Sequence, residues 1–319
     1  MARAVRTVLV YHETSVANYA AELIRRAPDL KVITASNREE AQALQAQADC
    51  LFAWRYPFDL LVNVAADEPL PVFVQLMGAG VEDAARSGVL KRVPVARIVE
   101  QFGAPMAEYV FLHLLAEIKR YDAFRDAQER HAWEQKRTGS LRGMTLGVAG
   151  LGSIGAEIAR MARAFSMRVH GLSLRQLPVV GLDSQYGADD WQAFVASCDA
   201  VVLALPLTPQ TERVVDARVL AAMKPESILI NVGRGHLVDE EALLIALQEK
   251  RLRRAILDVF TVEPLPSDHP FWTHPRVTVT PHVSGPSLTE EVVGAFLENV
   301  ARYRAGEPLA GLVDAALGY

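Results

Sequence analysis

The sequence of 319 residues predicts an α/β protein made of two doubly wound parallel-sheet domains with a cleft between them. Two observations support this fold class. At about 150 residues per domain, the chain is long enough for roughly two domains with buried cores. Short β-branched segments also alternate with amphipathic segments along the chain, an order that favours parallel sheets covered by helices. No low-complexity linker separates two halves, so the domain boundary is expected inside helical or loop segments.

Nine short segments predict strands, because each is a run with β-branched residues that is bounded by turn residues. They cover residues 7–10, 31–34, 72–76, 145–149, 168–172, 200–205, 227–232, 255–259 and 277–280. The segments between them predict helices, because apolar residues recur three and four positions apart. Examples are Ile154, Ile158 and Met161, or Ala242, Leu243, Ala246 and Leu247.

The clearest helix prediction covers residues 287–305. Ser287 and Glu290 have the spacing of a capping box, and Gly306 is expected to end the helix. An apolar stripe at helical spacing is formed by Val292, Phe296 and Val300.

The composition excludes several classes of protein. The net charge is -5 and the 33 Lys and Arg residues are dispersed, which does not favour a nucleic-acid-binding protein. No apolar run approaches the roughly 20 residues of a membrane span. Small molecules are therefore the expected partners. The basic start runs directly into the first predicted strand without a signal-peptide pattern, so we expect a cytoplasmic location. Cys50 and Cys198 lack CxxC spacing, so we predict no disulfide and no metal site, but two buried small side chains.

The strongest local motif follows the predicted strand 145–149 and opens a predicted helix. It reads Gly150-x-Gly152-x-x-Gly155, the dinucleotide fingerprint of a Rossmann-like domain in its required context. Gly150 permits the tight turn, Gly152 lets the backbone approach a pyrophosphate, and Gly155 allows close packing of helix on strand. The other predicted contacts of this turn are Leu151, Ser153 and Ile154. The alternative is a tight strand-to-helix turn with no ligand.

The end of the next strand favours NADP(H). An acid is usual about 20 residues past the glycines in NAD-binding proteins, but here the residues are Ser173, Leu174 and Arg175. An acid would repel a 2'-phosphate by roughly 1 to 4 kcal/mol at contact, whereas Ser173 can donate a hydrogen bond and Arg175 can pair with it. NAD(H) remains possible, because Arg175 could be a solvated loop charge.

Three further polar residues each follow a predicted strand: Arg234, Glu263 and His282. Loops after the carboxyl ends of strands in an open parallel sheet converge on the ligand crevice, so these side chains could meet beside a nicotinamide. Each also has an ordinary structural explanation, as a surface cation, a turn residue before Pro264 and one of eight histidines.

Four ordered motifs, at residues 204–211, 230–235, 257–265 and 279–285, make the whole chain resemble the D-isomer-specific 2-hydroxyacid dehydrogenase family. Within it the chain is most similar to the glyoxylate/hydroxypyruvate reductase A subgroup, through Trp54, the Ser173 region and residues 106–109, 263–266 and 269–272. The resemblance implies a flavodoxin-like substrate domain at 1–98 plus 286–319 and a Rossmann domain at 99–285.

The resemblance also implies the catalytic residues. Arg234 would bind the substrate carboxylate and keto oxygen with its planar guanidinium. His282 would give its proton to the keto oxygen as hydride arrives at carbon, a general-acid role worth about 10² to 10⁴ in rate. Glu263 would hydrogen-bond the other imidazole nitrogen, fix its orientation and favour the imidazolium.

Further contacts follow from the same resemblance. The turn after strand 72–76 could cradle a carboxylate with its backbone amides. The substrate contacts would be Trp54, Met77, Gly78, Ala79, Gly80, Arg234 and His282. The remaining cofactor contacts would be Leu205, Pro206, Thr211, Val232, Gly233, Arg234, Asp258 and His282. A homodimer is implied, with Trp133 reaching a second subunit or serving a packing role.

The sequence therefore predicts an NADP(H)-preferring reductase of small 2-keto acids, glyoxylate and hydroxypyruvate first, with His282 as general acid and base. One alternative is a dehydrogenase for another D-2-hydroxy acid, such as D-lactate or 3-phosphoglycerate, or for formate, using NAD. The other is a dinucleotide-regulated binding protein without turnover.

Overall fold

The computed structural model describes residues 4–65, 68–174 and 181–316. The chain divides into two compact units, which we treat separately: unit 1 is Met1–Gln101 with Ser287–Tyr319, and unit 2 is Phe102–Pro286. Each unit contains one sheet, and every strand pair in both sheets is parallel. The prediction of two parallel-sheet α/β domains is confirmed.

Unit 1 is built on a five-stranded sheet of order β2-β1-β3-β4-β5. Its strands are β1 (Thr7–Tyr11), β2 (Lys31–Ala35), β3 (Cys50–Ala53), β4 (Val74–Leu76) and β5 (Val95–Ala96). Its helices are α1 (Val16–Arg26), α2 (Arg38–Leu44), α3 (Asp59–Val62), α4 (Glu82–Ser87) and α11 (Thr289–Ala305), with short 3₁₀ turns η1 (Gln45–Gln47) and η2 (Val89–Lys91).

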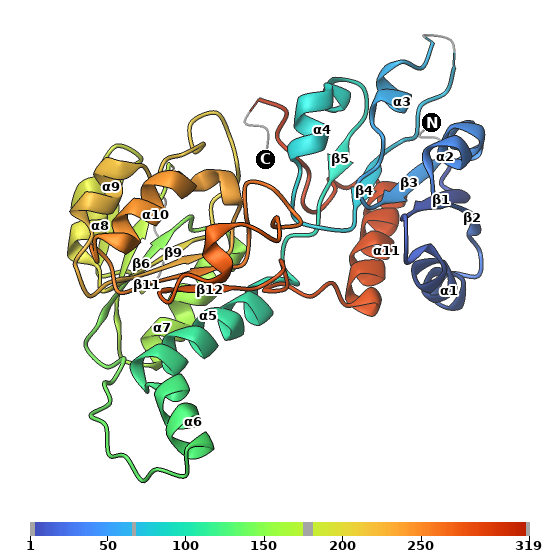
Figure 1. Cartoon of the computed structure of the whole chain (residues 1–319). Helices are drawn as coiled ribbons and strands as arrows, with labels where there is room; N and C mark the ends of the chain where they lie inside the picture. The colour runs from blue at the N-terminus through green and yellow to red at the C-terminus, as the bar shows by residue number, and fades with distance from the viewer. Residues whose placement is uncertain (1–3, 66–67, 175–180, 317–319) are drawn as a thin grey trace. The chain divides into compact units, whose positions relative to one another are not determined.

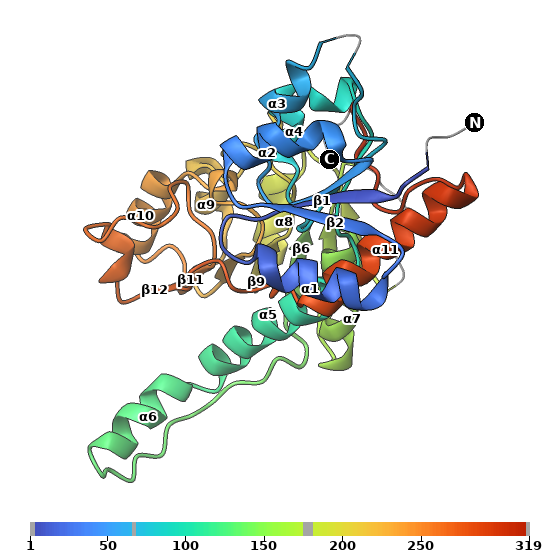
Figure 2. The same ribbon diagram turned by 90° about the vertical axis from the view of Figure 1, so that its right-hand side faces the viewer.

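Helices cover both faces of this sheet, with α1 and α11 packed together on one face and α2, α3 and α4 on the other (Figures 1 and 2). Phe296 of α11 stacks on Phe52 of β3 at a ring distance of 4.7 Å. The strands β1, β3, β4 and β5 are therefore buried on both faces, which explains their nearly continuous apolar sequences.

Unit 2 is built on a seven-stranded sheet of order β12-β11-β10-β9-β6-β7-β8. Its strands are β6 (Thr145–Ala149), β7 (Arg168–Leu172), β8 (Ser184–Tyr186), β9 (Ala200–Leu203), β10 (Ile228–Asn231), β11 (Arg254–Leu257) and β12 (Val277–Val279). Its helices are α5 (Gly103–Ile118), α6 (Tyr121–Glu129), α7 (Ser153–Ala164), α8 (Trp191–Ser197), α9 (Ala217–Ala222) and α10 (Glu240–Gln248), with η3 (Gly235–Leu237) and η4 (Pro270–Trp272).

The chain order of unit 2 creates a topological switch point. From β6 the chain moves to β7 on one side, then returns to β9 on the other side of β6. In Figure 1, α5 and α7 lie on one face of this sheet, and α8, α9 and α10 lie on the other. Ligands of open α/β sheets bind at the carboxyl edge beside such a switch.

All nine predicted strands are present, with ends that differ by a few residues. Three observed strands, β3, β5 and β8, were not predicted. The reason is composition: β3 reads CLFA and β8 reads SQY, neither of which contains a β-branched residue, and β5 is two residues long. Pairing with a neighbouring strand, rather than local propensity, makes them strands.

The predicted capping box of the last helix is wrong. The helix α11 begins at Thr289, its N-cap is Leu288, and no side chain caps it. The Leu288 carbonyl accepts the N–H groups of Glu291 and Val292, so the first turn starts too late for Ser287 to cap it. The other features are confirmed: Gly306 ends the helix with φ 73°, and the stripe Val292, Phe296 and Val300 is buried.

Both cysteines are buried and unpaired, as predicted. Among the described residues, no helix is long and apolar enough to cross a membrane. The helix α6 continues from α5 and projects away from the sheet of unit 2, and a loop returns from it (Figure 2). Trp133 lies in this loop with 94% of its surface exposed.

Candidate functional site

Three neighbouring strands of unit 2 deliver polar residues to one edge of the sheet. The strands β10, β11 and β12 lie side by side and are parallel. Arg234 follows β10, Asp258 directly follows β11, and His282 follows β12. Because these positions are the carboxyl ends of adjacent parallel strands, the three residues belong to one edge.

His282 and Glu263 form a hydrogen-bonded pair. Nδ1 of His282 lies 2.8 Å from Oε2 of Glu263, while Oε1 of Glu263 accepts the backbone N–H of Phe260 at 2.9 Å. The carboxylate can only accept, so Nδ1 carries a proton and Nε2 is the ring atom left for proton exchange. The imidazole is about half exposed, with 49% of its surface accessible.

The charge state of Glu263 is favoured by these contacts. Burial acts to raise the pKa of the carboxyl, but the hydrogen bonds from His282 and Phe260, and the charges of His282 and Arg234, outweigh burial and lower the pKa. Glu263 is therefore an anion when it holds the imidazole.

A buried asparagine holds the turn that carries Arg234. The side chain of Asn231 donates from Nδ2 to the Arg234 carbonyl at 2.9 Å and accepts the Gly233 N–H through Oδ1 at 3.1 Å. Nη1 of Arg234 donates to the Gly233 carbonyl at 2.7 Å. Val232 is buried between Asn231 and this turn. Asn231 had no predicted role, although its position at the end of a predicted strand was a signal for one.

Asp258 organises the loop that presents His282. It is fully buried, and Oδ1 accepts the Thr280 hydroxyl at 2.6 Å and the Val283 N–H at 2.9 Å, while Oδ2 accepts the Ser284 N–H at 2.9 Å. The His282 N–H donates to the Asp258 carbonyl at 2.9 Å. Asp258 was predicted only as a cofactor contact, and Thr280 was not among the predicted site residues.

The three glycines of the turn differ in how much room each leaves for a side chain. Gly150 has φ 96°, and a Cβ there would lie 2.6 Å from the Ala204 carbonyl oxygen after β9. A Cβ on Gly155 would lie 1.8 Å from the Gly150 carbonyl oxygen, so the helix packs directly on the strand end. A Cβ on Gly152 would meet no protein atom within 4 Å. The fold therefore requires Gly150 and Gly155, but leaves free space at Gly152, where α7 begins.

The other predicted cofactor residues lie at the carboxyl ends of β7 and β9. Leu151 lies against Gly171 of β7, and Ser173 follows that strand, with its hydroxyl 3.4 Å from Nε2 of Gln185. Leu174 is largely exposed, and Arg175 lies outside the described residues. After β9, Thr211 donates to the Pro206 carbonyl at 2.7 Å and so folds the loop that contains Leu205. Ser153 and Ile154 begin α7.

In unit 1 the predicted substrate residues lie at the carboxyl ends of two adjacent strands, β3 and β4. Trp54 follows β3, and its ring lies so close to Gly78, after β4, that a Cβ there would be 2.7 Å from Cζ3. His12, after β1, stacks on Trp54 at 6.1 Å, and the Arg55 guanidinium lies 5.9 Å from the same ring. The side chain of Met77 is buried, while Ala79 and Gly80 are partly exposed. The N–H of Met77 donates to the Ala53 carbonyl at 3.0 Å, so Met77 supports the turn from below the strand end.

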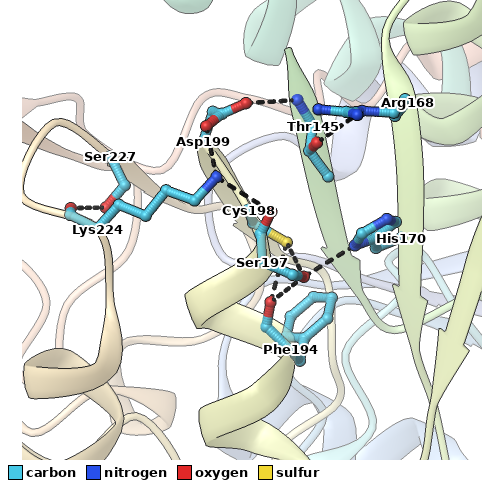
Figure 3. Close-up of polar contacts among 9 residues, drawn as sticks. All are labelled: Thr145, Arg168, His170, Phe194, Ser197, Cys198, Asp199, Lys224 and Ser227. Atoms are coloured by element: carbon cyan, nitrogen blue, oxygen red, sulfur yellow. Dashed lines mark hydrogen bonds and ion pairs between the residues drawn. The ribbon is translucent and has the colours of Figure 1, made fainter. Parts of the chain in front are cut away.

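A second polar cluster lies at the opposite edge, near the amino ends of β6, β7 and β9 (Figure 3). Nδ1 of His170 lies 2.8 Å from the Ser197 hydroxyl, which donates to the Phe194 carbonyl at 2.7 Å. The single hydroxyl proton is thus committed to a carbonyl, so His170 cannot remove it and Ser197 is not an activated nucleophile.

The charged residues of this cluster connect the amino ends of neighbouring strands. Lys224 pairs with Oδ1 of Asp199 at 2.7 Å, and Oδ2 accepts the Thr145 N–H at 2.7 Å (Figure 3). These contacts join the starts of β6 and β9, which is a structural role. Among the residues that the structure describes, no group of three or more His, Cys, Asp or Glu could hold a metal.

Comparisons with known proteins show the family of this chain. Residues 111–284 match the family described as D-isomer specific 2-hydroxyacid dehydrogenase, NAD binding domain. The chain is 34% identical over 280 residues to a protein of Serratia proteamaculans named glyoxylate/hydroxypyruvate reductase A, covering 85% of this chain and 88% of that protein.

Solved structures are similar over nearly the full length. A D-isomer specific 2-hydroxyacid dehydrogenase family protein from Aeromonas salmonicida has 34% identity and a TM-score of 0.87, covering 97% of this chain and 99% of that one. An NADPH-dependent glyoxylate/hydroxypyruvate reductase from Sinorhizobium meliloti, in complex with NADP and sulfate, has 28% identity and a TM-score of 0.88. That similarity covers 98% of this chain and all of the other.

Proposed function

Because this chain belongs to the D-isomer-specific 2-hydroxyacid dehydrogenase family, we propose that it reduces glyoxylate and hydroxypyruvate to the corresponding 2-hydroxy acids with NADPH. The chain is an NAD(P)-dependent 2-hydroxyacid dehydrogenase, and the proposal concerns its substrates, its cofactor preference and the roles of its residues. The observation that carries it is the His282–Glu263 pair, 2.8 Å apart, at the sheet edge that also carries Arg234.

The residues of unit 2 fit a dinucleotide. The turn at Gly152 leaves space that protein atoms do not fill, and α7 begins there, so its N-terminal N–H groups suit a pyrophosphate. The predicted contacts of Leu205, Pro206, Thr211, Val232 and Gly233 lie after β9 and β10, on the same edge. Bound NADPH supplies the hydride.

Each catalytic residue has one task in this proposal. Arg234 binds the carboxylate and the keto oxygen of the substrate through its planar guanidinium. His282 donates the proton on Nε2 to the keto oxygen as the carbonyl carbon is reduced, and it accepts that proton in the reverse direction. Glu263 keeps the Nδ1–H engaged, so the ring presents Nε2 in a fixed orientation.

We assign substrate binding in unit 1 to Trp54 and to the turn formed by Met77, Gly78, Ala79 and Gly80. The backbone amides that follow Met77 in this turn suit a carboxylate, whereas the Met77 N–H donates to the Ala53 carbonyl. The indole of Trp54, fixed by His12 and Gly78, limits the size of the keto acid.

The NADP(H) preference is proposed from Ser173 and Arg175, which stand where an NAD enzyme usually has an acid. Relatives of similar fold have been solved with NADP or NADPH bound, which supports the same preference. NAD(H) would bind without the contacts to the 2'-phosphate.

We also propose a homodimer formed through the projecting α6 and its loop. Trp133 is almost fully exposed beside a hollow of about 800 Å³ lined by Phe124, Ala127 and His131, among others. An exposed apolar surface of this kind on a projecting segment is typical of an interaction site. Light scattering should give twice the chain mass for the wild type and a lower mass for Trp133→Asp.

The enzymatic proposal is tested by following reduced-nicotinamide absorbance with glyoxylate, hydroxypyruvate and pyruvate, with NADPH and NADH in parallel. We expect NADPH-dependent turnover of the first two acids, and a fall of about 10² to 10⁴ in His282→Ala. Turnover only on another 2-keto acid would move the substrate assignment. Tight NADPH binding without turnover on any acid would favour a dinucleotide-regulated binding protein.

A further inference from the structure

A chain of three hydrogen-bonded side chains connects α5 to the loop of His282. Tyr109, on α5, has its hydroxyl 2.7 Å from Oγ1 of Thr280, and Thr280 bonds to Oδ1 of Asp258 at 2.6 Å. Asp258 accepts the N–H groups of Val283 and Ser284, which lie directly after His282. All of these residues belong to unit 2.

The donor and acceptor of each bond in this chain are fixed. The carboxylate of Asp258 only accepts, so the Thr280 hydroxyl must give its single proton to Oδ1. Thr280 then has only lone pairs for its other partner, so the Tyr109 hydroxyl donates. Burial raises the pKa of Tyr109 to about 12, so the phenol keeps this proton over the range in which the enzyme would work.

The loop of His282 contains a backbone conformation that requires support from neighbouring residues. His282 has φ 54°, in the left-handed region that residues other than glycine rarely adopt. A backbone in this conformation persists where surrounding contacts over-determine it. Those contacts are the His282 N–H bonds to the carbonyls of Asp258 and Thr280, and the three bonds that the Asp258 carboxylate accepts.

We propose that Tyr109 is a positioning residue for the reaction, which holds the His282 loop in its productive conformation through Thr280 and Asp258. This inference rests on the proposed function, because it assigns Tyr109 an effect on the proton transfer that His282 performs. Tyr109 contacts no reacting atom in this scheme. Its hydroxyl acts by keeping the Thr280 hydroxyl directed at Asp258.

The test compares Tyr109→Phe, Thr280→Val and Thr280→Ser with Tyr303→Phe as a control, since Tyr303 belongs to unit 1, where its ring packs against Phe73. With glyoxylate and NADPH, we expect kcat to fall about fivefold in Tyr109→Phe, the factor of one ordinary net hydrogen bond, and by more in Thr280→Val, which also loses the bond to the Asp258 carboxylate. Thr280→Ser, which keeps the hydroxyl, and Tyr303→Phe should keep the wild-type kcat.

A second arm separates positioning from a general loss of structure. In the His282→Ala background, measured in single turnovers with enzyme in excess, Tyr109→Phe should cause no further loss, because the residue it positions is absent. A further fivefold loss in that background would overturn the proposal. So would an unchanged kcat in Tyr109→Phe while His282→Ala is impaired.

A third arm does not depend on turnover. Hydrogen–deuterium exchange of the peptide that contains residues 280–284 should be faster in Tyr109→Phe than in the wild type and in Tyr303→Phe. Equal exchange in all three would overturn the proposal even if the enzyme turned over none of the acids. Absence of wild-type turnover with faster exchange in Tyr109→Phe would reject the proposed function but retain the support of the loop.

Discussion

Alanine at Gly152 should weaken cofactor binding without loss of stability, whereas alanine at Gly155 should destabilise the fold. A Cβ at Gly152 meets no protein atom within 4 Å, and the residue has φ -70°, which alanine adopts readily. Alanine restricts the unfolded chain, which stabilises by about 0.4–1 kcal/mol, but it is a poorer N-cap than glycine by a similar amount. We therefore expect Gly152→Ala to unfold within about 2 °C of the wild type.

At Gly155 the same methyl group has no room. Its Cβ would lie 1.8 Å from the Gly150 carbonyl oxygen and 2.9 Å from the carbonyl carbon, whereas ordinary contacts begin at 3.4 Å. The backbone of the turn must move by more than 1 Å, and overpacking of this kind costs about 1–3 kcal/mol or more. For a unit of this size we expect the Tm to fall by about 5–10 °C.

Affinity for the cofactor should be reduced in Gly152→Ala even though its fold is intact. If the backbone at Gly152 approaches a pyrophosphate, its methyl group removes at least one charge-assisted hydrogen bond, worth about 1.5–3 kcal/mol. The Kd for NADPH, measured by fluorescence titration, should then rise roughly 10- to 100-fold in a normally folded Gly152→Ala protein. Wild-type NADPH affinity in Gly152→Ala, or a Tm as low as that of Gly155→Ala, would refute this reasoning.

Three other variants test the rest of the site. Arg234→Lys should lower kcat/KM for glyoxylate by roughly 10- to 100-fold in steady-state assays, since a lysine cannot form the planar fork; wild-type kinetics would remove Arg234 from the site. Gly78→Ala should raise the KM for glyoxylate about threefold or more with little change in kcat, because its Cβ displaces the Trp54 ring. An unchanged KM would contradict the role of Trp54. For Glu263 the folded pKa lies below the ordinary 4.5, so its stabilisation is present above that value and is lost as pH falls through the folded pKa. The difference in unfolding free energy between wild type and Glu263→Gln, measured by denaturant titration, should shrink below about pH 4.5. A difference that grows below this pH would contradict a lowered pKa for Glu263.

The candidate site was predictable to the extent that its residues follow strands. Short apolar segments indicated β10, β11 and β12, and Arg234, Asp258 and His282 come soon after them in the sequence. The rule that carboxyl ends of parallel strands share an edge needs only the order of elements. The glycine spacing was informative for the same reason, since a strand, a tight turn and a helix are local in sequence.

Other parts depend on residues that are distant in the chain. Tyr109 and Thr280 are 171 positions apart, and no local pattern links a helix tyrosine to a loop threonine. The contact of Trp54 with Gly78 requires β3 and β4 to be neighbours, and β3 has no β-branched residue to predict it. The helix α11 was correctly predicted, but its capping box failed because the backbone of Leu288 and not Ser287 begins the first turn.

By itself, the sequence determined the two parallel-sheet domains, the dinucleotide turn and the strand-end positions of Arg234, Glu263 and His282, because periodicity, turn chemistry and motif spacing are local properties. The family resemblance implied the Glu263–His282 bond, which the structure places at Nδ1. Only the tertiary structure decided that Asn231 holds the Arg234 turn and that Tyr109 reaches Asp258 through Thr280. These contacts depend on how strands and helices pack, and a hydrogen bond forms only when that packing brings donor and acceptor within about 3 Å.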